Sequence, residues 1–283
     1  MKPLSLALIG REISYSKSPE IFEAIFKHDR VCGEFALKSV EPEALGRWLR
    51  EAAESGLDGL AVTIPYKAAV ISLLNELDPT ARIIGAVNCV AIKGRRLHGF
   101  NTDWIGFARS IAEYKANVSG GSALIAGAGG AARAVIHALH HDYDIRRFVV
   151  LGRSAQALKQ LKDHFEQVLE GSIVHIVTPG DSMPASLPSR TVAVNCTPLG
   201  GWREPNASPW RAGCDWSRVA FYVDLNYNEG NRLVAEARSK GIAALDGSAM
   251  LVAQAVESYR VWTGRTVPFD PVYEAVFGGS GAE

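Results

Sequence analysis

The stretch of sequence that decides the fold reads SALIAGAGGAARA and covers residues 122–134. An apolar run comes first, then a glycine-rich turn, then a helical pattern over 131–141 and another apolar run over 147–151. This order predicts one βαβ unit, which is the context that a dinucleotide-binding turn requires. We therefore expect a nucleotide here, and the alternative is a glycine-rich turn that holds no ligand.

Each small residue of this turn has its own physical reason. Gly127 permits the tight turn, Gly129 lets the backbone approach a pyrophosphate, and Ala132 allows the helix to pack closely on the strand. The N-terminus of the helix then faces the phosphate with its unpaired N–H groups. The expected nucleotide contacts come from one continuous run, Gly127, Ala128, Gly129, Gly130 and Ala131.

The end of the following strand indicates which nucleotide binds. A site for NAD places an acidic residue there, about 20 residues beyond the turn, to bond the ribose 2′-hydroxyl. This chain has Arg153 and Ser154 instead. Because a guanidinium binds phosphate through two parallel hydrogen bonds, this pair favours NADP over NAD. The alternative is that Arg153 is a solvated loop charge.

Further apolar runs continue the pattern on the C-terminal side. Strands are predicted over 173–177, 191–195 and 220–225, and a helix over 231–240 ends at Gly241. Alternating strands and helices of this kind predict a doubly wound sheet. The last long helical pattern covers 247–264, and its periodicity does not decide which half of the chain it packs against.

The first hundred residues form a second α/β series. The predicted elements are strands over 4–9, 34–40 and 59–63, helices over 19–27, 42–55 and 67–77, and a hairpin over 86–92 and 96–100. Strands separated by helices indicate a mainly parallel sheet, because a parallel connection needs a crossover long enough to hold a helix. The fold class is therefore α/β.

Composition bounds the class of protein. With 283 residues, the chain is long enough for about two domains. Thirty Lys and Arg balance thirty Asp and Glu, so the basic excess that drives nucleic-acid or acidic-membrane binding is missing. The four cysteines lack metal-binding spacing, and no apolar run approaches the ~20 residues of a membrane-spanning helix. We expect a cytoplasmic protein with a small-molecule partner, no metal, and no nucleic-acid or membrane partner.

Polar residues gather at the ends of predicted strands in the first half, the rim where open α/β sheets bind ligands. They form three groups: Ser16 with Ser18, Thr63 with Lys67, and Asn88 with Asp103. Together they suit a small polyhydroxylated acid. Taken singly, Ser18 could be a helix N-cap, Lys67 a surface lysine and Asp103 the N-cap of the next helix.

In combination these residues make the sequence recognisable, because it resembles the shikimate dehydrogenase family over nearly the whole chain. In the first half, H-S-x-S-P and N-V-T-x-P-x-K match 15–19 and 61–67 except at their first positions, and G-A-V-N and G-x-N-T-D-x-x-G match 85–88 and 99–106. In the second half, G-A-G-G-A-A-R-A matches 127–134, N-R-T corresponds to 152–154, N-x-T-P-L-G to 195–200, and D-G-x-x-M-L-x-x-Q to 246–254.

The resemblance implies a fold of two domains and a reaction. Residues 1–104 and 248–283 would form an open α/β substrate domain, to which the C-terminal helix returns, and residues 105–247 an NADP-binding Rossmann domain. The reaction would be the reversible, NADP-dependent reduction of 3-dehydroshikimate to shikimate, in aromatic amino-acid and chorismate biosynthesis. The protein would be a monomer or a homodimer.

The resemblance also implies roles for single residues. Lys67 would be the acid/base, and Asp103 would orient it and hold the substrate hydroxyl. Ser16 and Ser18 would bind the substrate carboxylate. The remaining positions are Thr63, Asn88, Tyr227 and Gln254 around the ring, and Thr197 and Gly247 at the cofactor.

Several positions depart from the family pattern. Ala61 replaces a substrate-facing asparagine, which could relax or change substrate choice. Tyr15 replaces histidine, and Gly201 stands where methionine is usual. The segment 202–216, rich in tryptophan and proline, is either a loop over the cofactor or a packed surface element. The alternatives for function are a dehydrogenase of quinate or another shikimate-like hydroxy acid, and a catalytically silent NADP-binding regulator.

Overall fold

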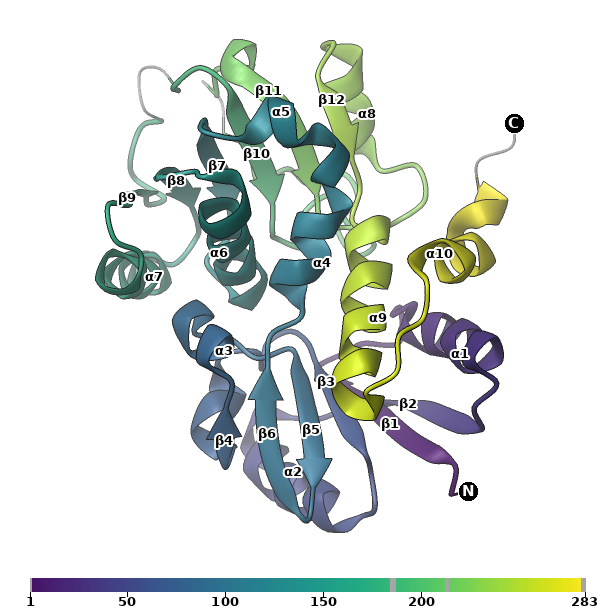
Figure 1. Cartoon of the computed structure of the whole chain (residues 1–283). Coiled ribbons are helices and arrows are strands. Elements are labelled where there is room, and N and C mark those ends of the chain that lie inside the picture. Colours follow the sequence, from purple (N-terminus) through teal and green to yellow (C-terminus); the bar gives the residue numbers. More distant parts are fainter. Residues whose placement is uncertain (1, 184–186, 212–213, 281–283) are drawn as a thin grey trace. The chain divides into compact units, whose positions relative to one another are not determined.

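The computed structural model describes residues 2–183, 187–211 and 214–280, and the chain divides into two compact units. Unit 1 comprises Met1–Gly106 and Leu251–Glu283, and unit 2 comprises Phe107–Met250. Among the described residues, each unit contains one six-stranded sheet flanked by helices (Figure 1). The α/β fold class is confirmed.

The sheet of unit 1 is mixed, with the strand order β2-β1-β3-β5-β6-β4. Strand β1 pairs in parallel with β2 and β3, whereas β3, β5 and β6 pair antiparallel, as the predicted hairpin requires. The strands are β1 (Leu4–Gly10), β2 (Gly33–Ser39), β3 (Gly59–Val62), β4 (Glu76–Leu77), β5 (Cys89–Lys93) and β6 (Arg96–Phe100).

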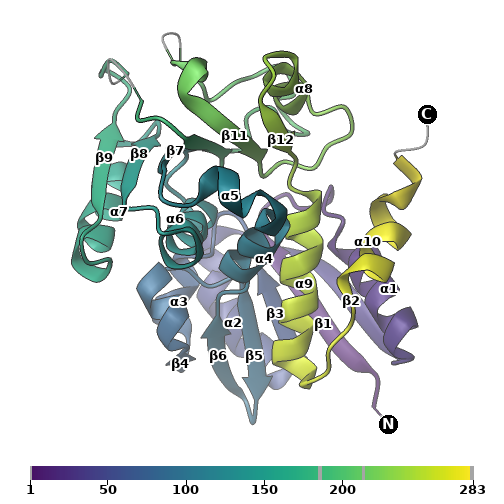
Figure 2. The ribbon, with the colours of Figure 1, turned by 45° about the horizontal axis from the view of Figure 1, so that its top comes forward.

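Alternating side chains of β1 supply two separate cores, because successive residues of a strand point to opposite faces. Leu6 and Leu8 join the cluster on the face covered by α1 (Ser18–Asp29), α9 (Ser248–Thr263) and α10 (Phe269–Phe277). Figure 2 shows these three helices on the same side of the sheet. Ala7 and Ile9 pack on the other face, against the short 3₁₀ turn Pro42–Ala44 and α2 (Leu45–Glu54).

The C-terminal helices return to unit 1, as expected. On α9, Val252, Val256 and Tyr259 are buried in the same cluster as Leu6 of β1. The indole N–H of Trp262 donates to the carbonyl of Val90 in β5 at 3.0 Å. Helix α9 is therefore an integral part of the core of unit 1.

The helix expected over 67–77 is wrong. Only a 3₁₀ turn forms there, Ala69–Leu73, and the chain then enters the two-residue strand β4 beside β6. Asn75 bonds both backbone groups of Leu97, so sheet pairing overrides the helical pattern. The helix begins later as α3 (Pro79–Ile84), where the Asp78 carboxylate caps the N–H of Thr80 at 2.9 Å.

The sheet of unit 2 is entirely parallel, with the order β12-β11-β10-β7-β8-β9. Counted along the chain this is the doubly wound order 3-2-1-4-5-6, whose direction reverses between β7 and β10. The strands are β7 (Ser122–Ala126), β8 (Arg147–Leu151), β9 (Ile173–Val177), β10 (Thr191–Asn195), β11 (Val219–Asp224) and β12 (Ala243–Leu245).

Helices connect these strands. They are α6 (Gly130–Tyr143), α7 (Ala155–Val168) and α8 (Arg232–Ser239), and they follow α4 (Asp103–Ser110), a 3₁₀ turn (Ala112–Tyr114) and α5 (Lys115–Val118). Helix α7 lies outside the elements predicted from sequence. In the described part of the chain, the helices are too short or too polar to cross a membrane.

Candidate active and nucleotide-binding sites

Lys67 and Asp103 form a largely buried ion pair in unit 1. The Lys67 Nζ lies 2.6 Å from Asp103 Oδ2, and the side chains are 15% and 5% exposed. Lys67 stands in the turn after β3, where its carbonyl accepts from the Val87 N–H at 2.7 Å, and Asp103 begins α4. Lys67 is therefore no solvated surface lysine.

Asn88 holds the second oxygen of this carboxylate. Its Nδ2 donates to Asp103 Oδ1 and to Thr102 Oγ1, both at 2.9 Å, and its Oδ1 accepts from the Thr102 N–H at 2.6 Å. Gln254 of α9 approaches the same Nδ2 with its Oε1 at 3.2 Å. The carboxylate of Asp103 is thus fixed by Lys67 on one oxygen and by Asn88 on the other.

This arrangement can move a proton. An ammonium carries three hydrogens, and the neighbouring carboxylate fixes its direction. With 85% or more of both side chains removed from solvent, bulk water is a poor competitor for the pair. The geometry suits general acid/base catalysis on an oxygen of a bound substrate.

Ser16 and Ser18 lie together at the start of α1. The Ser16 hydroxyl donates to Ser18 Oγ at 3.0 Å and accepts from the Ser18 N–H at 3.2 Å. Ser18 is the first residue of the helix and Lys17 is its N-cap, so the reading of Ser18 as an N-cap is wrong.

Thr63 follows β3 at the same edge of the sheet at which β1 ends and the segment with Ser16 and Ser18 begins. Its N–H donates to the carbonyl of Ile9, the residue beside the end of β1, at 2.9 Å. Because β1 and β3 are parallel, the chain leaves both strands at one rim. Tyr227, also expected at the substrate, belongs to unit 2, where it is half-buried on the connection after β11.

The glycine-rich turn of unit 2 has the geometry that a pyrophosphate needs. Gly127 has φ +109°, a conformation that side chains disfavour, and its N–H donates to the Leu151 carbonyl at 2.8 Å. Gly129 precedes α6, and no other described atom would lie within 4 Å of a Cβ placed on it. The first turn of α6 has no side-chain cap among the described residues, so its N–H groups remain for an anion.

The loop after β10 lies beside this turn, at the point where the sheet order reverses. The Cys196 N–H donates to the Ala126 carbonyl at 2.8 Å, and a Cβ on Gly127 would be 3.2 Å from the Cys196 carbonyl oxygen. Thr197 follows directly, with its N–H and hydroxyl both bonded to Asn195 Oδ1 at 2.9 and 2.7 Å. Open parallel sheets bind ligands at such a switch point.

Arg153 and Ser154 follow β8 and are exposed. Ser154 caps α7, where its Oγ accepts from the Ala157 N–H at 3.2 Å, and Arg153 carries a positive charge beside the same helix N-terminus. Gly247, in contrast, is required by packing, because a Cβ there would meet the Leu225 carbonyl oxygen at 2.2 Å.

The sequence did not predict two residues that form hydrogen bonds with residues of the expected motifs or their neighbours. Ser258 on α9 lies 2.8 Å from Thr102 Oγ1, and Asp224 at the end of β11 bonds both Asn195 and Asn226. The signal for Ser258 was its position one helical turn after Gln254. The signal for Asp224 was a charged residue closing an apolar run. Within the described part of the chain, no group of three His, Cys, Asp or Glu is placed to hold a metal ion.

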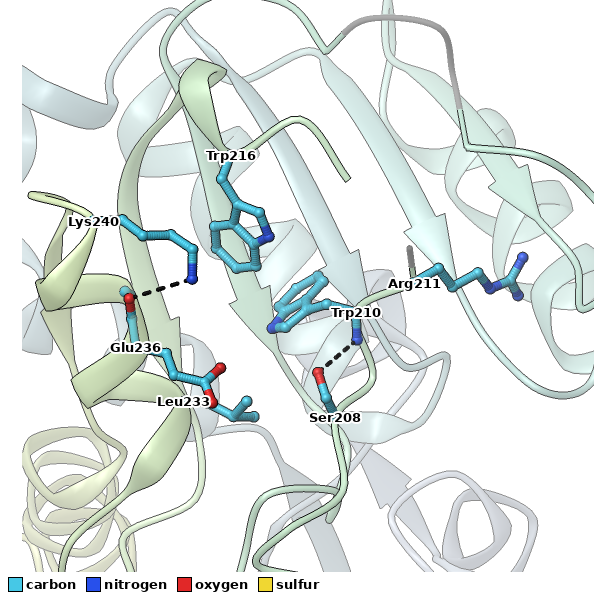
Figure 3. A pocket seen from close by; sticks show the side chains of 8 residues that line it. Ser208, Trp210, Arg211, Trp216, Leu233, Glu236 and Lys240 are labelled. Carbon is cyan, nitrogen blue, oxygen red and sulfur yellow. Dashed lines mark hydrogen bonds between the residues drawn. The ribbon is translucent and has the colours of Figure 1, made fainter. Parts of the chain in front are cut away.

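Part of the tryptophan-rich segment packs on the sheet of unit 2. Trp210 and Trp216 meet each other and Tyr222 edge to face, and they line a pocket of about 220 Å³ beside α8 (Figure 3). Its lining is Ser208, Trp210, Arg211, Trp216, Leu233, Glu236, Ala237 and Lys240. These are not the residues expected at substrate or nucleotide. Residues 212–213 of this segment lie outside the described ones.

Two family models match the chain. The model of the shikimate dehydrogenase substrate binding domain matches residues 8–90, and that of the shikimate 5'-dehydrogenase C-terminal domain matches residues 247–277. Among curated proteins, the shikimate dehydrogenase (NADP(+)) of Symbiobacterium thermophilum is 34% identical over 94% of this chain and 90% of that protein.

Solved structures share the fold of the whole chain. The shikimate 5-dehydrogenase of Thermus thermophilus, solved with NADP(H) and shikimate, is 30% identical with a TM-score of 0.80, covering 96% of this chain and 98% of that one. The 5-ketofructose reductase of Gluconobacter sp. strain CHM43 is 26% identical with a TM-score of 0.82, covering 98% and 99%. Relatives with more than one activity thus have this architecture.

Proposed function

Because the chain belongs to the shikimate dehydrogenase family of NAD(P)-dependent oxidoreductases, we propose that it reduces 3-dehydroshikimate reversibly to shikimate with NADPH. The observation that carries the proposal is the buried Lys67–Asp103 pair, with 2.6 Å between Nζ and Oδ2 and Asn88 on the other carboxylate oxygen. A ligand-binding regulator would not need this pair, which is an argument against a silent paralogue.

The proposed nucleotide site uses unit 2. Gly127, Ala128, Gly129, Gly130 and Ala131 would contact the pyrophosphate, Arg153 and Ser154 the 2′-phosphate, and Thr197 and Gly247 the rest of the cofactor. The open space at Gly129, the uncapped start of α6 and the exposed charge of Arg153 fit a phosphorylated dinucleotide. When bound, the nucleotide supplies the hydride. We propose residues 105–247 as the nucleotide-binding domain.

The proposed substrate site uses residues 1–104 and 248–283. Ser16 and Ser18 would bind the carboxylate, and Thr63, Asn88 and Gln254 the ring hydroxyls. Both amide hydrogens of Asn88 are used inside the network, so its contact with substrate is limited to Oδ1. Asn88 therefore acts mainly by holding Asp103.

Lys67 is assigned the proton transfer. Reducing a ketone creates an alkoxide, and the Lys67 ammonium neutralises it by giving up one proton at the substrate oxygen. Asp103 keeps Nζ in place, and its own buried position excludes water from the pair. In the oxidation of shikimate, the same lysine in its neutral form takes the hydroxyl proton.

A second candidate substrate class has one observation in its favour. Ala61 removes an amide from the N-V-T-x-P-x-K motif, and its side chain is buried in the core on the α1 and α9 face of the sheet. With one hydrogen-bonding group fewer, the site would discriminate less strictly between shikimate and quinate, another shikimate-like hydroxy acid, or a different polyhydroxylated ketone such as 5-ketofructose.

The test is NADPH formation or consumption, followed by absorbance. Shikimate and quinate are offered with NADP and with NAD, and 5-ketofructose with NADPH and NADH. We expect rapid turnover of shikimate with NADP and at least about tenfold slower turnover with every other pair. Faster turnover of quinate or 5-ketofructose would replace the proposed substrate, and Ala61→Asn would then be expected to shift the preference toward shikimate. No turnover by protein that binds NADP would favour the silent paralogue.

A further inference from the structure

Asp224 is a fully buried carboxylate that the proposed mechanism does not use. It closes β11 and has 0% of its surface exposed. Its Oδ2 accepts from the Tyr222 hydroxyl at 2.8 Å, and its Oδ1 accepts from the N–H and Nδ2 of Asn226 at 2.9 and 2.7 Å. The Nδ2 of Asn195 lies 3.1 and 3.2 Å from its two oxygens. Every partner is a donor, which suits an ionised carboxylate.

This carboxylate decides which way two asparagine side chains point. An ionised carboxylate only accepts, so the amides of Asn195 and Asn226 must turn their NH₂ groups toward it. The oxygen of Asn195 then faces away, and there it accepts from the N–H and the hydroxyl of Thr197 at 2.9 and 2.7 Å. With the amide reversed, Asn195 would present hydrogens to these two donors.

Asn226 completes the hold on the same loop. Its Nδ2 lies 3.0 Å from the Thr197 carbonyl and 3.3 Å from that of Leu199, which also accepts from Asn195 Nδ2 at 2.8 Å. A Cβ on Gly201 would lie 2.3 Å from Asn226 Oδ1, so the loop closes tightly around this side chain. The N–H, hydroxyl and carbonyl of Thr197 are thus all fixed by two asparagines that share one carboxylate.

We propose that Asp224 is a positioning residue of the nucleotide site, which sets the Thr197 loop by orienting the amides of Asn195 and Asn226. This inference rests on the proposed function, because it takes Thr197 as a contact of the bound dinucleotide. Asp224 itself touches no reacting group. Through the two asparagines it sets the loop after β10, which lies beside the Gly127 turn where the sheet order reverses, and we expect its effect on the binding of nucleotide.

The test is Asp224→Asn, measured by titration of purified protein with NADP and by initial rates at varied shikimate and saturating NADP. An amide at 224 presents hydrogens to Asn195 or to Asn226. If Asn195 turns, Thr197 loses the acceptor of its N–H and hydroxyl, and if Asn226 turns, the Thr197 carbonyl loses its donor. We expect the Kd of NADP to rise roughly 10-fold or more, and the KM of shikimate at saturating NADP to stay within about twofold. Wild-type affinity for NADP in the variant would overturn the inference.

The matched control is Tyr222→Phe. It removes one bond to the same carboxylate and leaves both asparagines untouched, so it tests the general effect of weakening this buried cluster. We expect a lower melting temperature with a Kd of NADP within about twofold of wild type. An equal loss of NADP affinity in Tyr222→Phe would reduce Asp224 to a purely structural residue and overturn the inference.

A second variant covers the case in which Asp224→Asn does not fold. Asn226→Ala keeps the carboxylate and removes the donor that reaches the Thr197 carbonyl. Asn226→Ala must also weaken the binding of NADP. An unchanged Kd of NADP would contradict the proposed effect of Asp224 through Asn226. Titration of the wild type with NADP distinguishes a failure of the proposed cofactor from a failure of the proposed role of Asp224. A wild type that binds no NADP overturns both. A wild type that binds NADP beside unaffected variants overturns this inference alone.

Discussion

The Nζ of Lys67 lies 2.6 Å from Oδ2 of Asp103, and 36 residues of chain separate them. The hairpin of β5 and β6 lies between them in sequence, and Asn88 at its start secures the other oxygen of the same carboxylate. The start of the hairpin thus supplies the support, and the turn after β3 and the first residue of α4 supply the pair.

Replacing Lys67 by Met should slow turnover strongly and leave nucleotide binding intact. The thioether side chain keeps much of the volume but carries no proton, so kcat should fall about 10²–10⁴-fold. Steady-state kinetics and NADP titration check this, with Lys93→Met at the exposed hairpin turn as the control. Substantial activity in Lys67→Met would remove Lys67 from its assigned role.

Two glycines should respond in opposite ways to alanine. At Gly129 the backbone is extended, with φ −84°, and a methyl group would meet no described atom within 4 Å, so stability should stay within about 0.5 kcal/mol. The methyl group would stand where the pyrophosphate approaches, and NADP affinity should drop at least about tenfold. Calorimetry and nucleotide titration measure both quantities, and tight NADP binding would be the contrary result.

At Gly247 the methyl group would meet the Leu225 carbonyl oxygen at 2.2 Å. Backbone cannot move aside as a flexible side chain does, so Gly247→Ala should lower the free energy of unfolding by about 1–3 kcal/mol or more. Denaturant unfolding of this variant, run beside Gly129→Ala, gives the comparison. Equal stability of the two variants would be incompatible with the packing described here.

Arg153 should decide between the two nucleotides. Arg153→Ala removes an exposed guanidinium beside the N-terminus of α7 and should reduce kcat/KM with NADP about 10–100-fold, with little change for NAD. Arg147→Ala, at the exposed other end of the same strand, is the control and should alter neither. Parallel losses with both nucleotides would mean that Arg153 does not read the 2′-phosphate.

His137 should make the protein less stable in acid. Burial lowers the pKa of His137 to about 4, and its pKa in the unfolded chain is about 6.5, so the unfolded state binds the proton more readily between these values. By linkage, stability falls as pH drops from about 6.5 to 4, by about 3 kcal/mol in all. His137→Gln should flatten this part of the stability curve, whereas His175→Gln on the exposed side of β9 should not. Identical curves for wild type and His137→Gln would contradict the expectation.

The strands were predictable because buried strands appear in the sequence as short apolar runs. The apolar runs that precede Gly127 and surround Gly94 became β7 and the hairpin at nearly the expected residues. The region 67–77 was not predictable from periodicity, because the pairing of β4 with β6 depends on residues 20 or more positions away. Asp78-Pro79 was a usable helix-start signal for α3.

Helix α7 was not predicted, because Ser154 at its start was interpreted only as a phosphate-binding residue and not as a helix N-cap. Ser154 is predicted to bind a phosphate, and it is also the N-cap of that helix, whose buried Leu158, Leu161 and Phe165 have helical spacing. The motifs predicted the residue types of the candidate site. They did not predict that Asn88 donates both amide hydrogens to neighbouring side chains, because these bonds depend on the positions of Thr102 and Asp103 in the fold.

Unit 1 is interrupted in sequence, and this has a consequence for synthesis on the ribosome. The contact between Asn88 and Gln254 joins residues 166 positions apart. At roughly 5–20 residues per second, translation separates them by on the order of ten to thirty seconds. During that interval the nascent N-terminal sheet lacks α9, with Val252, Val256 and Trp262 still absent from its apolar face. The intervening Rossmann-like unit can therefore finish folding while the earlier one still waits, exposed to chaperones and proteases, for its last helices.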